Sequence, residues 1–519
     1  MSEALAAQLD LLPGYLTAHL QLALVALLLG AALSVPAGVW VTRRAALESG
    51  VLGLASVVQT IPSLALLAIM VPLLGSLGAL TARAFGVALR SIGYLPAVVA
   101  LTLYSVLPIL RNTVTGIAGV DPALVEAARG VGMTRAQRLR RVELPLAMPV
   151  IVAGVRTAAV WVVGAATLST PVGATSLGNY IFSGLQTRNT TAVLVGCAAS
   201  ALLALALDQT IRLLEAGARR RSRRLVLAAS AILVALYGYT AASLAAGRLA
   251  APRPALRIGA KTFTEQYILA ELLALQVRRE TGLDAEIVGS LGSTVAFDAL
   301  RSGDLDVYVD YSGTIWATIM KRGGSFATRD GVLEEVSAFL AREHGIRVVG
   351  ALGFENTYAL GMLATRAAEL GVGRIGDLAP LAQHLEIGGD YEFFQRAEWA
   401  ALVETYGLRF RSQRSMDSAL MYQAVAEGQV DVISAFSTDG RIAAYGIVLL
   451  ADERGVIPPY DAIVLAGPGV ATRAPQALEA LGRLEGTIDA STMQRLNLAV
   501  DRDGRAPGDV ARELLDGSR

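Results

Sequence analysis

The segment EAARGVGMTRAQRLRRVELP, residues 126–145, carries five arginines and two glutamates and interrupts a mostly apolar part of the chain. The stretches on either side of it, residues 95–115 and 146–163, have the composition of helices that cross a membrane. From charge alone, the segment is either a solvated loop on the cytoplasmic side of a membrane or a contact surface for a soluble partner. The order of helix-favouring and helix-ending residues within the segment distinguishes these two possibilities.

Two short helices are predicted within and just before this segment. Asp121 is well placed as a helix N-cap, with Pro122 at the first helical position. Gly130 and Gly132 predict the end of that helix, and residues 134–142 favour a second one. Two helices lying on the membrane surface would present a knob to the cytosol, so we favour the contact surface over a plain loop.

The bulk composition places part of the chain in lipid. The 519 residues are 54% hydrophobic and 17% charged, with a mean hydropathy of +0.51, whereas a soluble domain is about 25% charged. Nearly all long apolar runs lie in the first 250 residues. The net charge of +1 indicates no nucleic-acid partner, and the single cysteine, Cys197, permits no disulfide within the chain.

Six membrane spans are predicted, since about 20 apolar residues cross the hydrocarbon core. Pro62 should kink or interrupt the second of them. The six are expected at residues 19–41, 51–74, 94–117, 146–170, 192–214 and 225–246.

The arginines set the orientation of these spans. Arg43 and Arg44, the segment 126–145, and the cluster at residues 219–224 fall on one side if the spans alternate. The positive-inside tendency makes that side the cytoplasm. The N-terminus and everything after about residue 250 are then outside, and the predicted location is the inner or plasma membrane, crossed several times.

Residues 255–519 have the pattern of a separate α/β domain. Short apolar strands alternate with amphipathic helices, as in LRIGA followed by TEQYILAELLALQVRRETG. About 265 residues suit two lobes with a ligand cleft at the strand ends. We therefore predict a membrane domain at 1–250 and an extracytoplasmic domain at 255–519. The chain should cross between the lobes near residues 353–358 and 457–461.

The polar segment resembles the EAA loop of ABC-importer permeases. The resemblance implies that this loop docks on an ATPase subunit and transmits its movement to the spans. No G-x-x-x-x-G-K-[ST] sequence occurs in the chain, so the ATPase would be a separate polypeptide and the chain would not be an enzyme. The family also implies a homodimer of this chain. The implied coupling residues are Glu126, Ala127, Ala128, Gly132, Leu144 and Pro145.

The outer domain resembles the substrate-binding proteins for glycine betaine, carnitine, choline and related quaternary amines, whose fold is a two-lobed type II periplasmic-binding-protein fold. Five motifs carry the resemblance: KTFTEQYILAEL, GDLDVYVDYSGT, ENTYALGM, DVISAFSTDGRI and PPYDA. A trimethylammonium group donates no hydrogen bond and is held best by aromatic faces. The family pattern implies an aromatic cage of Tyr311, Tyr358, Phe436 and Tyr460, with polar contacts from Gln266, Thr314 and Asn356.

Other readings of single residues stay open. Tyr311 and Phe436 could be ordinary core packing. Arg396 could reach a ligand carboxylate across the cleft. Asp306, Asp310 and Asp439 have no companion cluster of ligands and are read as turn or surface residues. No metal site and no cofactor is therefore expected.

Three functions compete. The first is an importer subunit fused to its receptor, for a glycine betaine, choline or carnitine type osmoprotectant or, alternatively, for ergothioneine, which also carries a trimethylated nitrogen. The second is a membrane-anchored sensor, for which the chain has no output domain. The third is a secondary transporter, which would need charged or unwound sites in the spans, where Arg111 and Arg156 are the main charges.

Overall fold

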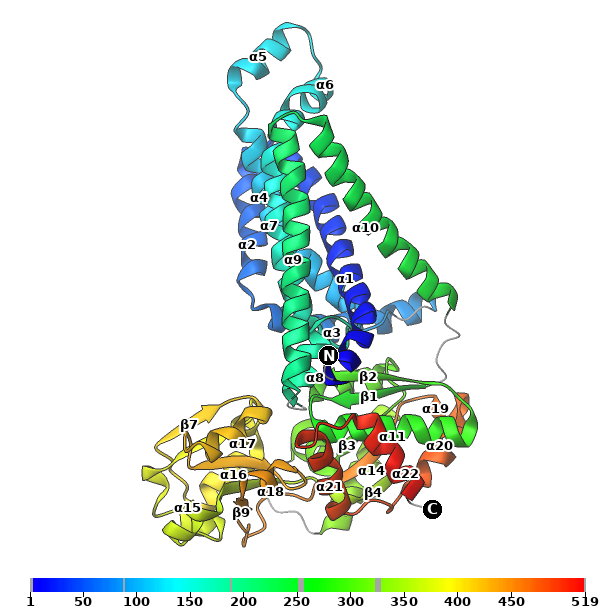
Figure 1. Ribbon diagram of the computed structural model, residues 1–519, viewed down its shortest axis with the longest axis vertical. Helices are drawn as coiled ribbons and strands as arrows, with labels where there is room; N and C mark the ends of the chain where they lie inside the picture. The colour runs from blue at the N-terminus through cyan, green and yellow to red at the C-terminus, as the bar shows by residue number, and fades with distance from the viewer. Residues whose placement is uncertain (1–2, 87–88, 187–188, 251–255, 323–327, 518–519) are drawn as a thin grey trace. The chain divides into compact units, whose positions relative to one another are not determined.

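The computed structural model describes residues 3–86, 89–186, 189–250, 256–322 and 328–517. The chain divides into two compact units. One comprises Met1–Phe182 and Thr191–Pro252, and the other comprises Ser183–Thr190 and Arg253–Arg519. The first unit contains helices only in its described part, and the second contains both sheets (Figure 1).

The first unit is a group of long helices joined by short ones. Its helices are α1 (Glu3–Val41), α2 (Ala45–Thr60), α3 (Ser63–Phe85), α4 (Tyr94–Ala118), α5 (Pro122–Gly130), α6 (Arg135–Arg138), η1 (Leu139–Glu143), α7 (Leu144–Ala166), η2 (Thr167–Val172), α8 (Gly178–Gln186, which runs into the second unit), α9 (Thr190–Arg219) and α10 (Arg223–Ala250).

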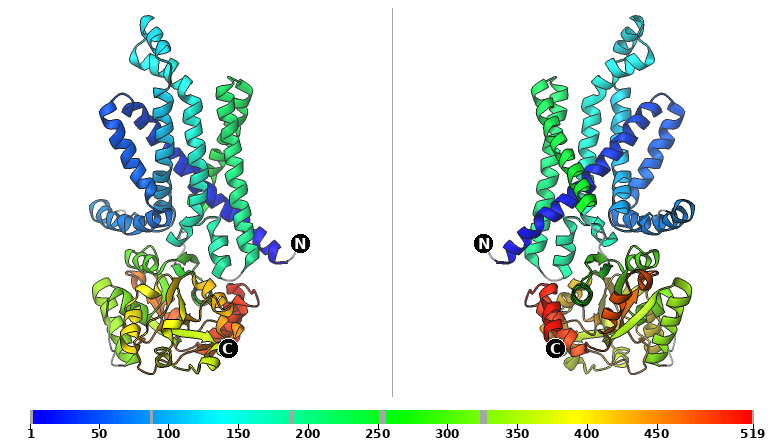
Figure 2. Two further views of the ribbon diagram at one scale, coloured as in Figure 1. Left: turned by 90° about the vertical axis from the view of Figure 1, so that its left-hand side faces the viewer. Right: turned by 90° about the vertical axis from the view of Figure 1, so that its right-hand side faces the viewer.

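Within the described residues, six helical segments are long and apolar enough to cross a membrane, and the predicted number of spans is therefore confirmed. The predicted interruption at Pro62 is confirmed, but the helix long and apolar enough to span lies at Ser63–Phe85 and not at the predicted residues 51–74. The chain leaves the helix at Ile61, whose ψ of 126° is extended, and a new helix starts at Ser63. The residue before a proline avoids the helical region, which explains the break before Pro62. Figure 2 shows α2 running along the helix group and α3 lying across its end.

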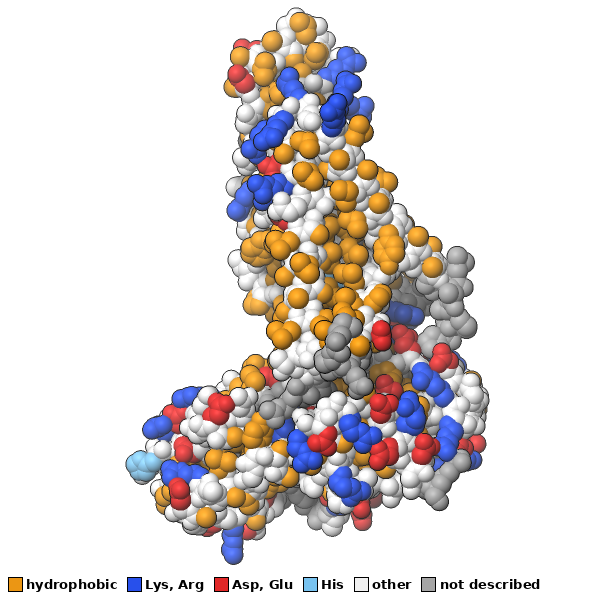
Figure 3. Space-filling view, viewed as in Figure 1, with side chains coloured by type: hydrophobic (Ala, Val, Ile, Leu, Met, Phe, Trp, Pro, Cys, Tyr) orange, Lys and Arg blue, Asp and Glu red, His pale blue; other side chains and the backbone are white. Residues whose placement is uncertain are grey.

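The basic turns of the first unit lie at one end of it. The turns α1–α2 and α9–α10 and the α5–α6 loop all face the end opposite α3 and α8 (Figures 1 and 2). Figure 3 shows arginine side chains gathered there and apolar side chains over the helices beyond. This arrangement agrees with the orientation that the positive-inside tendency predicts.

The α5–α6 loop forms as its sequence predicts in its first half. The Asp121 side chain accepts a hydrogen bond from Ala123 N at 2.8 Å, and Pro122 opens α5. Gly132 has a φ of 79°, a left-handed conformation that glycine adopts without strain. The prediction of a separate second helix over residues 134–142 is partly wrong. A helix does begin there, capped by Thr134, but α6 continues through the π-helical turn η1 into α7 without a break.

A buried ion cluster joins this loop to the first span. Glu143, whose side chain is 3% exposed, accepts a hydrogen bond from Arg138 Nε at 2.7 Å and pairs with Arg43, two residues past α1. Two arginines thus share one carboxylate: Arg138 is buried with it, and Arg43 is 39% exposed. Such a pair is costly to break from one side, because the remaining charge is left buried and unpaired. The cluster therefore ties α1 to the base of the α5–α6 loop.

The second unit contains ten strands in its described residues. They are β1 (Leu256–Lys261), β2 (Ala285–Leu291), β3 (Val307–Tyr311), β4 (Arg347–Glu355), β5 (Tyr358–Leu363), β6 (Glu386–Gly389), β7 (Ser412–Ser415), β8 (Val432–Phe436), β9 (Ile447–Leu449) and β10 (Asp461–Ala466). The α-helices between and after them are α11 (Thr264–Thr281), α12 (Ser293–Ser302), α13 (Ser312–Thr314), α14 (Arg329–Phe339), α15 (Ala364–Leu370), α16 (Ala397–Tyr406), α17 (Ser418–Ala426), α18 (Arg441–Tyr445), α19 (Val470–Arg473), α20 (Pro475–Gly482), α21 (Ala490–Asp501) and α22 (Pro507–Gly517).

Two five-stranded sheets define the two lobes of this unit. Their strand orders are β2-β1-β3-β10-β4 and β7-β6-β8-β5-β9. The chain passes from the first sheet to the second between β4 and β5, through Asn356 and Thr357, and returns between β9 and β10. Both passages fall where the sequence predicts them. The predicted two-lobed α/β fold is therefore confirmed.

The ion cluster yields a prediction about stability. Replacing Glu143 by alanine should lower the midpoint of thermal unfolding of the detergent-solubilised protein, because Arg138 is then left buried without a partner, at a cost of roughly 3 kcal/mol. The exposed Glu126 of α5 is the matched control: Glu126→Ala should change stability by less than about 0.5 kcal/mol. Equal midpoints for the two variants would contradict a structural role for the cluster.

Candidate functional site

The second unit holds a cleft between its two sheets, and aromatic residues at strand ends line it. Tyr311 ends β3, Phe436 ends β8 and Tyr358 begins β5. The antiparallel register places Tyr358 directly opposite Phe436. It also places Ala462 of β10 opposite Tyr311, so that Tyr460, two residues earlier, arrives at the same edge. The pairing of the strands therefore brings aromatic residues from distant parts of the sequence to one place.

Five of the lining rings form a continuous chain of contacts. Phe263 lies 6.2 Å from Tyr311 and 6.1 Å from Phe436, between ring centroids. Tyr358 continues the chain, 5.0 Å from Phe436 and 5.9 Å from Tyr460. A further lining residue, Tyr391, is largely exposed. We call Phe263, Tyr311, Tyr358, Phe436 and Tyr460 the aromatic cage.

The tyrosines of the cage are buried and neutral. Burial raises the pKa of Tyr311, Tyr358 and Tyr460 well above its usual value. Tyr311 donates a hydrogen bond to Glu265 Oε1 at 2.6 Å, and Tyr460 donates one to Glu398. These bonds hold the hydroxyls away from solvent and fix the orientation of the rings. The ring faces are then the surfaces that a ligand can contact.

Gly313 explains how Tyr460 reaches the cage. A Cβ atom at position 313 would lie 2.5 Å from the Tyr460 ring, closer than two carbon atoms can approach. The glycine of the DYSGT sequence therefore allows the ring to pack against the start of α13. A side chain there would move the ring or the helix.

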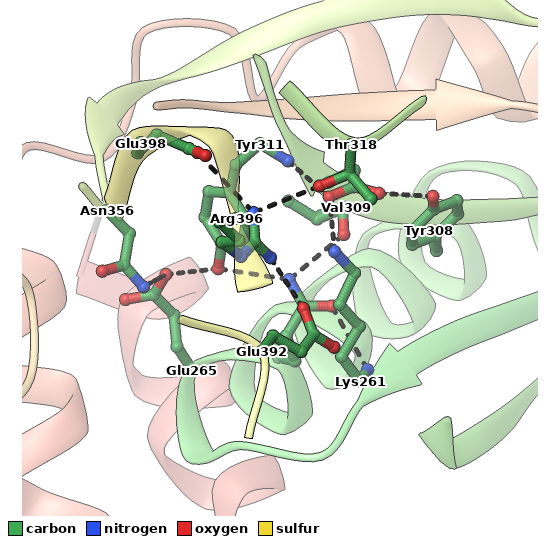
Figure 4. A network of polar contacts seen from close by, with 12 residues as sticks. Lys261, Glu265, Tyr308, Val309, Tyr311, Thr318, Asn356, Glu392, Arg396 and Glu398 are labelled. Atoms are coloured by element: carbon green, nitrogen blue, oxygen red, sulfur yellow. Dashed lines mark hydrogen bonds and ion pairs between the residues drawn. The ribbon is translucent and has the colours of Figure 1, made fainter. Parts of the chain in front are cut away.

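One cation also faces the cleft. The Arg396 side chain is 8% exposed, and its guanidinium lies 5.0 Å from the centroid of the Tyr358 ring. It pairs with Glu392 at 2.7 Å and donates to Thr318 Oγ1, across the cleft, at 3.3 Å (Figure 4). Among the described residues, its Nε has no hydrogen-bond partner. Arg396 therefore lines the cleft with a guanidinium whose Nε–H is buried and, in the described part of the chain, unpaired.

A second cation at the cleft has its charge neutralised. Lys261 Nζ pairs with Asp310, and both side chains are almost completely buried. The ammonium lies 5.6 Å from the centroid of the Tyr311 ring. The interpretation of Asp310 as a turn or surface residue is therefore wrong, because Asp310 is the buried partner of Lys261.

Six of the seven predicted site residues line this one cleft. They are Tyr311, Thr314, Asn356, Tyr358, Phe436 and Tyr460. The seventh, Gln266, is 1% exposed and lies behind the wall, where its Nε2 donates to Val309 O and to Tyr311 Oη. It is a support for the cage and not a lining residue of this conformation.

The sequence prediction missed lining residues of the cleft. Phe263 lies in the KTFTEQ motif, immediately before α11, and its place in that motif was the available signal. Asp390 follows β6, and its position after a strand of the second sheet was the corresponding signal. In the described ranges no group of three or more His, Cys, Asp or Glu side chains has the arrangement of a metal site.

Family models match both parts of the chain. Residues 254–517 match the substrate-binding domain of ABC-type glycine betaine transport systems. Residues 34–220 match the inner membrane component of binding-protein-dependent transport systems. The two matches together cover most of the chain and agree with its division into a helical unit and a two-lobed unit.

Individual relatives carry transport names. The chain is 30% identical over 491 residues to the ergothioneine transport permease/ergothioneine binding protein EgtU of Helicobacter pylori, covering 92% of this chain and 85% of that one. It is 42% identical over 197 residues, 38% of this chain, to 83% of the choline transport system permease protein OpuBB of Bacillus subtilis. It is 31% identical over 266 residues, 50% of this chain, to 85% of the carnitine transport binding protein OpuCC of Listeria monocytogenes.

These matches assign both units. The helical unit is a multi-pass membrane permease, and the two-lobed unit is a binding domain of the extracytoplasmic type. The chain therefore belongs to the binding-protein-dependent ABC importers, as a permease fused to a substrate-binding domain of the glycine betaine type.

Proposed function

We propose that this chain is the permease and receptor subunit of an ATP-driven importer of trimethylammonium zwitterions. The observation that carries the proposal is the aromatic cage with Arg396 beside it. Methyl groups on nitrogen leave no N–H to donate, so the positive charge is best held by ring faces, each contributing about 0.5–2 kcal/mol. Six residues predicted from the family pattern line the same cleft, which supports this ligand class.

The position of Arg396 at the cleft is an argument for a ligand that carries a carboxylate. A guanidinium that lines a cleft and is largely desolvated is suited to an anionic oxygen. Thr314 lines the same cleft and adds a hydroxyl, whereas the Lys261 ammonium at the cleft is already paired with Asp310. A molecule with a trimethylated nitrogen at one end and a carboxylate at the other fits this arrangement. Glycine betaine and carnitine have both groups, and choline lacks the carboxylate.

The α5–α6 loop supports coupling to a separate ATPase. Glu126 is exposed on α5 and Gly132 allows the turn into α6, so the loop offers a surface to a soluble partner. Leu144 and Pro145 begin α7, and the buried Glu143 cluster fixes that junction to α1. A push on the loop would then be passed to two spans. We also propose a homodimer, because six spans form half of a permease pathway in this family.

Ergothioneine is the second candidate ligand. The relative that matches along 92% of this chain is named for ergothioneine transport and has the same fusion of permease and binding protein. Ergothioneine is also a trimethylammonium zwitterion, so the cage and Arg396 suit it equally. Phe436, a ring without a hydroxyl, offers an apolar face to its heterocycle. Carnitine, glycine betaine and ergothioneine are therefore compared directly in the test below.

The first test measures which ligands bind. Isothermal titration calorimetry on the full chain in detergent micelles should give binding of at least one of glycine betaine, carnitine and ergothioneine. Arg396→Met should weaken that binding by about 10- to 100-fold, because a charge-assisted hydrogen bond to the carboxylate is lost. Any choline binding should change much less. The absence of heat for all four compounds would overturn the proposal, and equal losses for choline and a zwitterion would overturn the role of Arg396.

The second test addresses the cage. Phe436→Leu should weaken binding of the tightest zwitterion by about 3- to 30-fold, since it removes one ring face and keeps an apolar side chain of similar size. Phe436→Tyr is the matched control and should stay within about threefold of the parent, because it keeps the ring. Calorimetry on both variants checks this. If Phe436→Leu binds the zwitterion as tightly as the parent, the side chain at position 436 serves only in packing between the lobes.

The third test addresses coupling. Gly132→Val forces a β-branched side chain into a left-handed conformation, at a cost of about 1–3 kcal/mol, and should distort the loop without touching the cleft. In proteoliposomes with the cognate ATPase, ligand-stimulated ATP hydrolysis should fall at least tenfold while the ligand Kd stays unchanged. The control is Arg220→Ala in the α9–α10 turn. Full stimulation in Gly132→Val would contradict the assignment of the loop.

A further inference from the structure

Glu265 is a buried carboxylate directly behind the cleft. It is the second residue of α11 and is 2% exposed. It lines a smaller cavity that shares Phe263, Asn356 and Phe436 with the ligand cleft. Figure 4 shows its carboxylate next to Tyr311 and Asn356. One layer of side chains therefore separates this carboxylate from the space that a ligand would fill.

Four neutral groups donate hydrogen bonds to this carboxylate. Oε1 accepts from Tyr311 Oη at 2.6 Å and from Asn356 Nδ2 at 3.0 Å. Oε2 accepts from Thr438 Oγ1 and, at 3.0 Å, from Asn497 Nδ2. All four are donors, and a carboxylate with four such donors is arranged as an anion. Tyr311 and Asn356 line the ligand cleft themselves.

No positive charge accompanies Glu265. Within the described part of the chain, no lysine or arginine nitrogen forms an ion pair with it within 4.0 Å. The neighbouring cations are paired with other acids: Lys261 with Asp310, Arg396 with Glu392, and Arg441 with Asp439. Burial accordingly raises the pKa of Glu265, and its four hydrogen bonds oppose that rise only in part.

The two cavities together have an excess of negative charge. Their described walls carry three basic and six acidic side chains. The basic ones are Lys261, Arg396 and Arg441, and the acidic ones are Glu265, Asp390, Glu392, Asp417, Asp439 and Asp501. A buried carboxylate without a cationic partner is costly even when it accepts four hydrogen bonds. Something other than the stability of the empty domain therefore accounts for an anion here.

We propose that Glu265 is the counter-charge of the ligand's quaternary ammonium, which it attracts through the wall of the cage. The proposal rests on the proposed function, because it needs a cationic ligand. Two routes carry the attraction. The hydrogen bond from Tyr311 to Glu265 makes the Tyr311 ring more electron-rich, since hydrogen bonds in a low-dielectric interior polarise their donors. The carboxylate also attracts the cation directly, with little water between them.

Asn356 is oriented by the same carboxylate. Because its Nδ2 donates to Glu265, its Oδ1 is turned elsewhere, and that oxygen has no partner among the described residues. A partly negative oxygen, unpaired within the described ranges, is thus buried in a side chain that lines both cavities. Glu265 therefore acts as a positioning residue for Tyr311 and Asn356 as well as a charge.

The test separates charge from shape. Each cationic compound is paired with the analogue in which carbon replaces the quaternary nitrogen: glycine betaine with 3,3-dimethylbutanoate, choline with 3,3-dimethylbutan-1-ol, and ergothioneine with its carbon analogue. The Kd of the carbon analogue divided by the Kd of the cation, both measured by competition on the full chain, reports the preference for a cation. Glu265→Gln should reduce this ratio by about 10- to 100-fold, because the neutral amide keeps the shape and loses the charge.

A matched control lies on the same helix. Glu271 of α11 is also partly buried, near Gly508, and lines neither cavity. Glu271→Gln should leave the ratio unchanged. If Glu265→Gln weakens the cation and its carbon analogue equally, Glu265 is only structural and the inference fails. If the parent binds none of the cations, the proposed function fails instead.

A second variant covers the case in which Glu265→Gln does not fold. Asn497 contacts Glu265 from α21 and does not line the ligand cleft. The substitution Asn497→Lys would place an ammonium beside the carboxylate and cancel its charge. The preference for a cation should then fall as in Glu265→Gln, although Glu265 is still present. An unchanged ratio in a folded Asn497→Lys protein would overturn the inference.

Discussion

The attraction between a methylated ammonium and aromatic faces is the interaction on which the rest of this account depends. Such a cation offers no N–H group, so hydrogen-bond acceptors cannot select it and ring faces can. Rings are bulky and must come from several strands. The antiparallel pairs β5–β8 and β3–β10 solve this problem, because their registers bring Tyr358, Phe436, Tyr311 and Tyr460 to the cleft edges of the two sheets. The two passages of the chain between the lobes lie beside two of these tyrosines, so a movement of the lobes about these passages would open or close the cage.

Each unit contains a buried carboxylate that links separate elements of the fold. In the helical unit, Glu143, the last residue of the π-helical turn η1, pairs with Arg43 beyond α1. In the two-lobed unit, Glu265 joins α11 to the hinge through Asn356 and to the segment after β8 through Thr438. Charges of this kind contribute little to stability compared with apolar packing. They fix the geometry between the elements that they join.

The sequence predicted the architecture because its signals are local. Apolar runs gave the spans, Pro62 gave the interruption of the second span, and strand–helix alternation gave the two lobes. Six of the seven predicted site residues line one cleft because the motifs that carry them lie at or near strand ends. Gln266 was misplaced by one layer, since the direction of a side chain on α11 depends on how the helix packs. The π-helical turn before Leu144 and the isolation of Glu265 depend on packing between distant segments, and no local pattern reports them.

The most direct measurement is the proton NMR spectrum of the N-methyl groups of a bound ligand. Protons held against ring faces are shifted upfield by the ring currents, and methyl groups inside a cage of five rings face several at once. We predict a large upfield shift for the trimethylammonium signal of the bound zwitterion, reduced in Phe436→Leu and kept in Phe436→Tyr. A bound ligand whose N-methyl signal stays at its position in water would contradict the account.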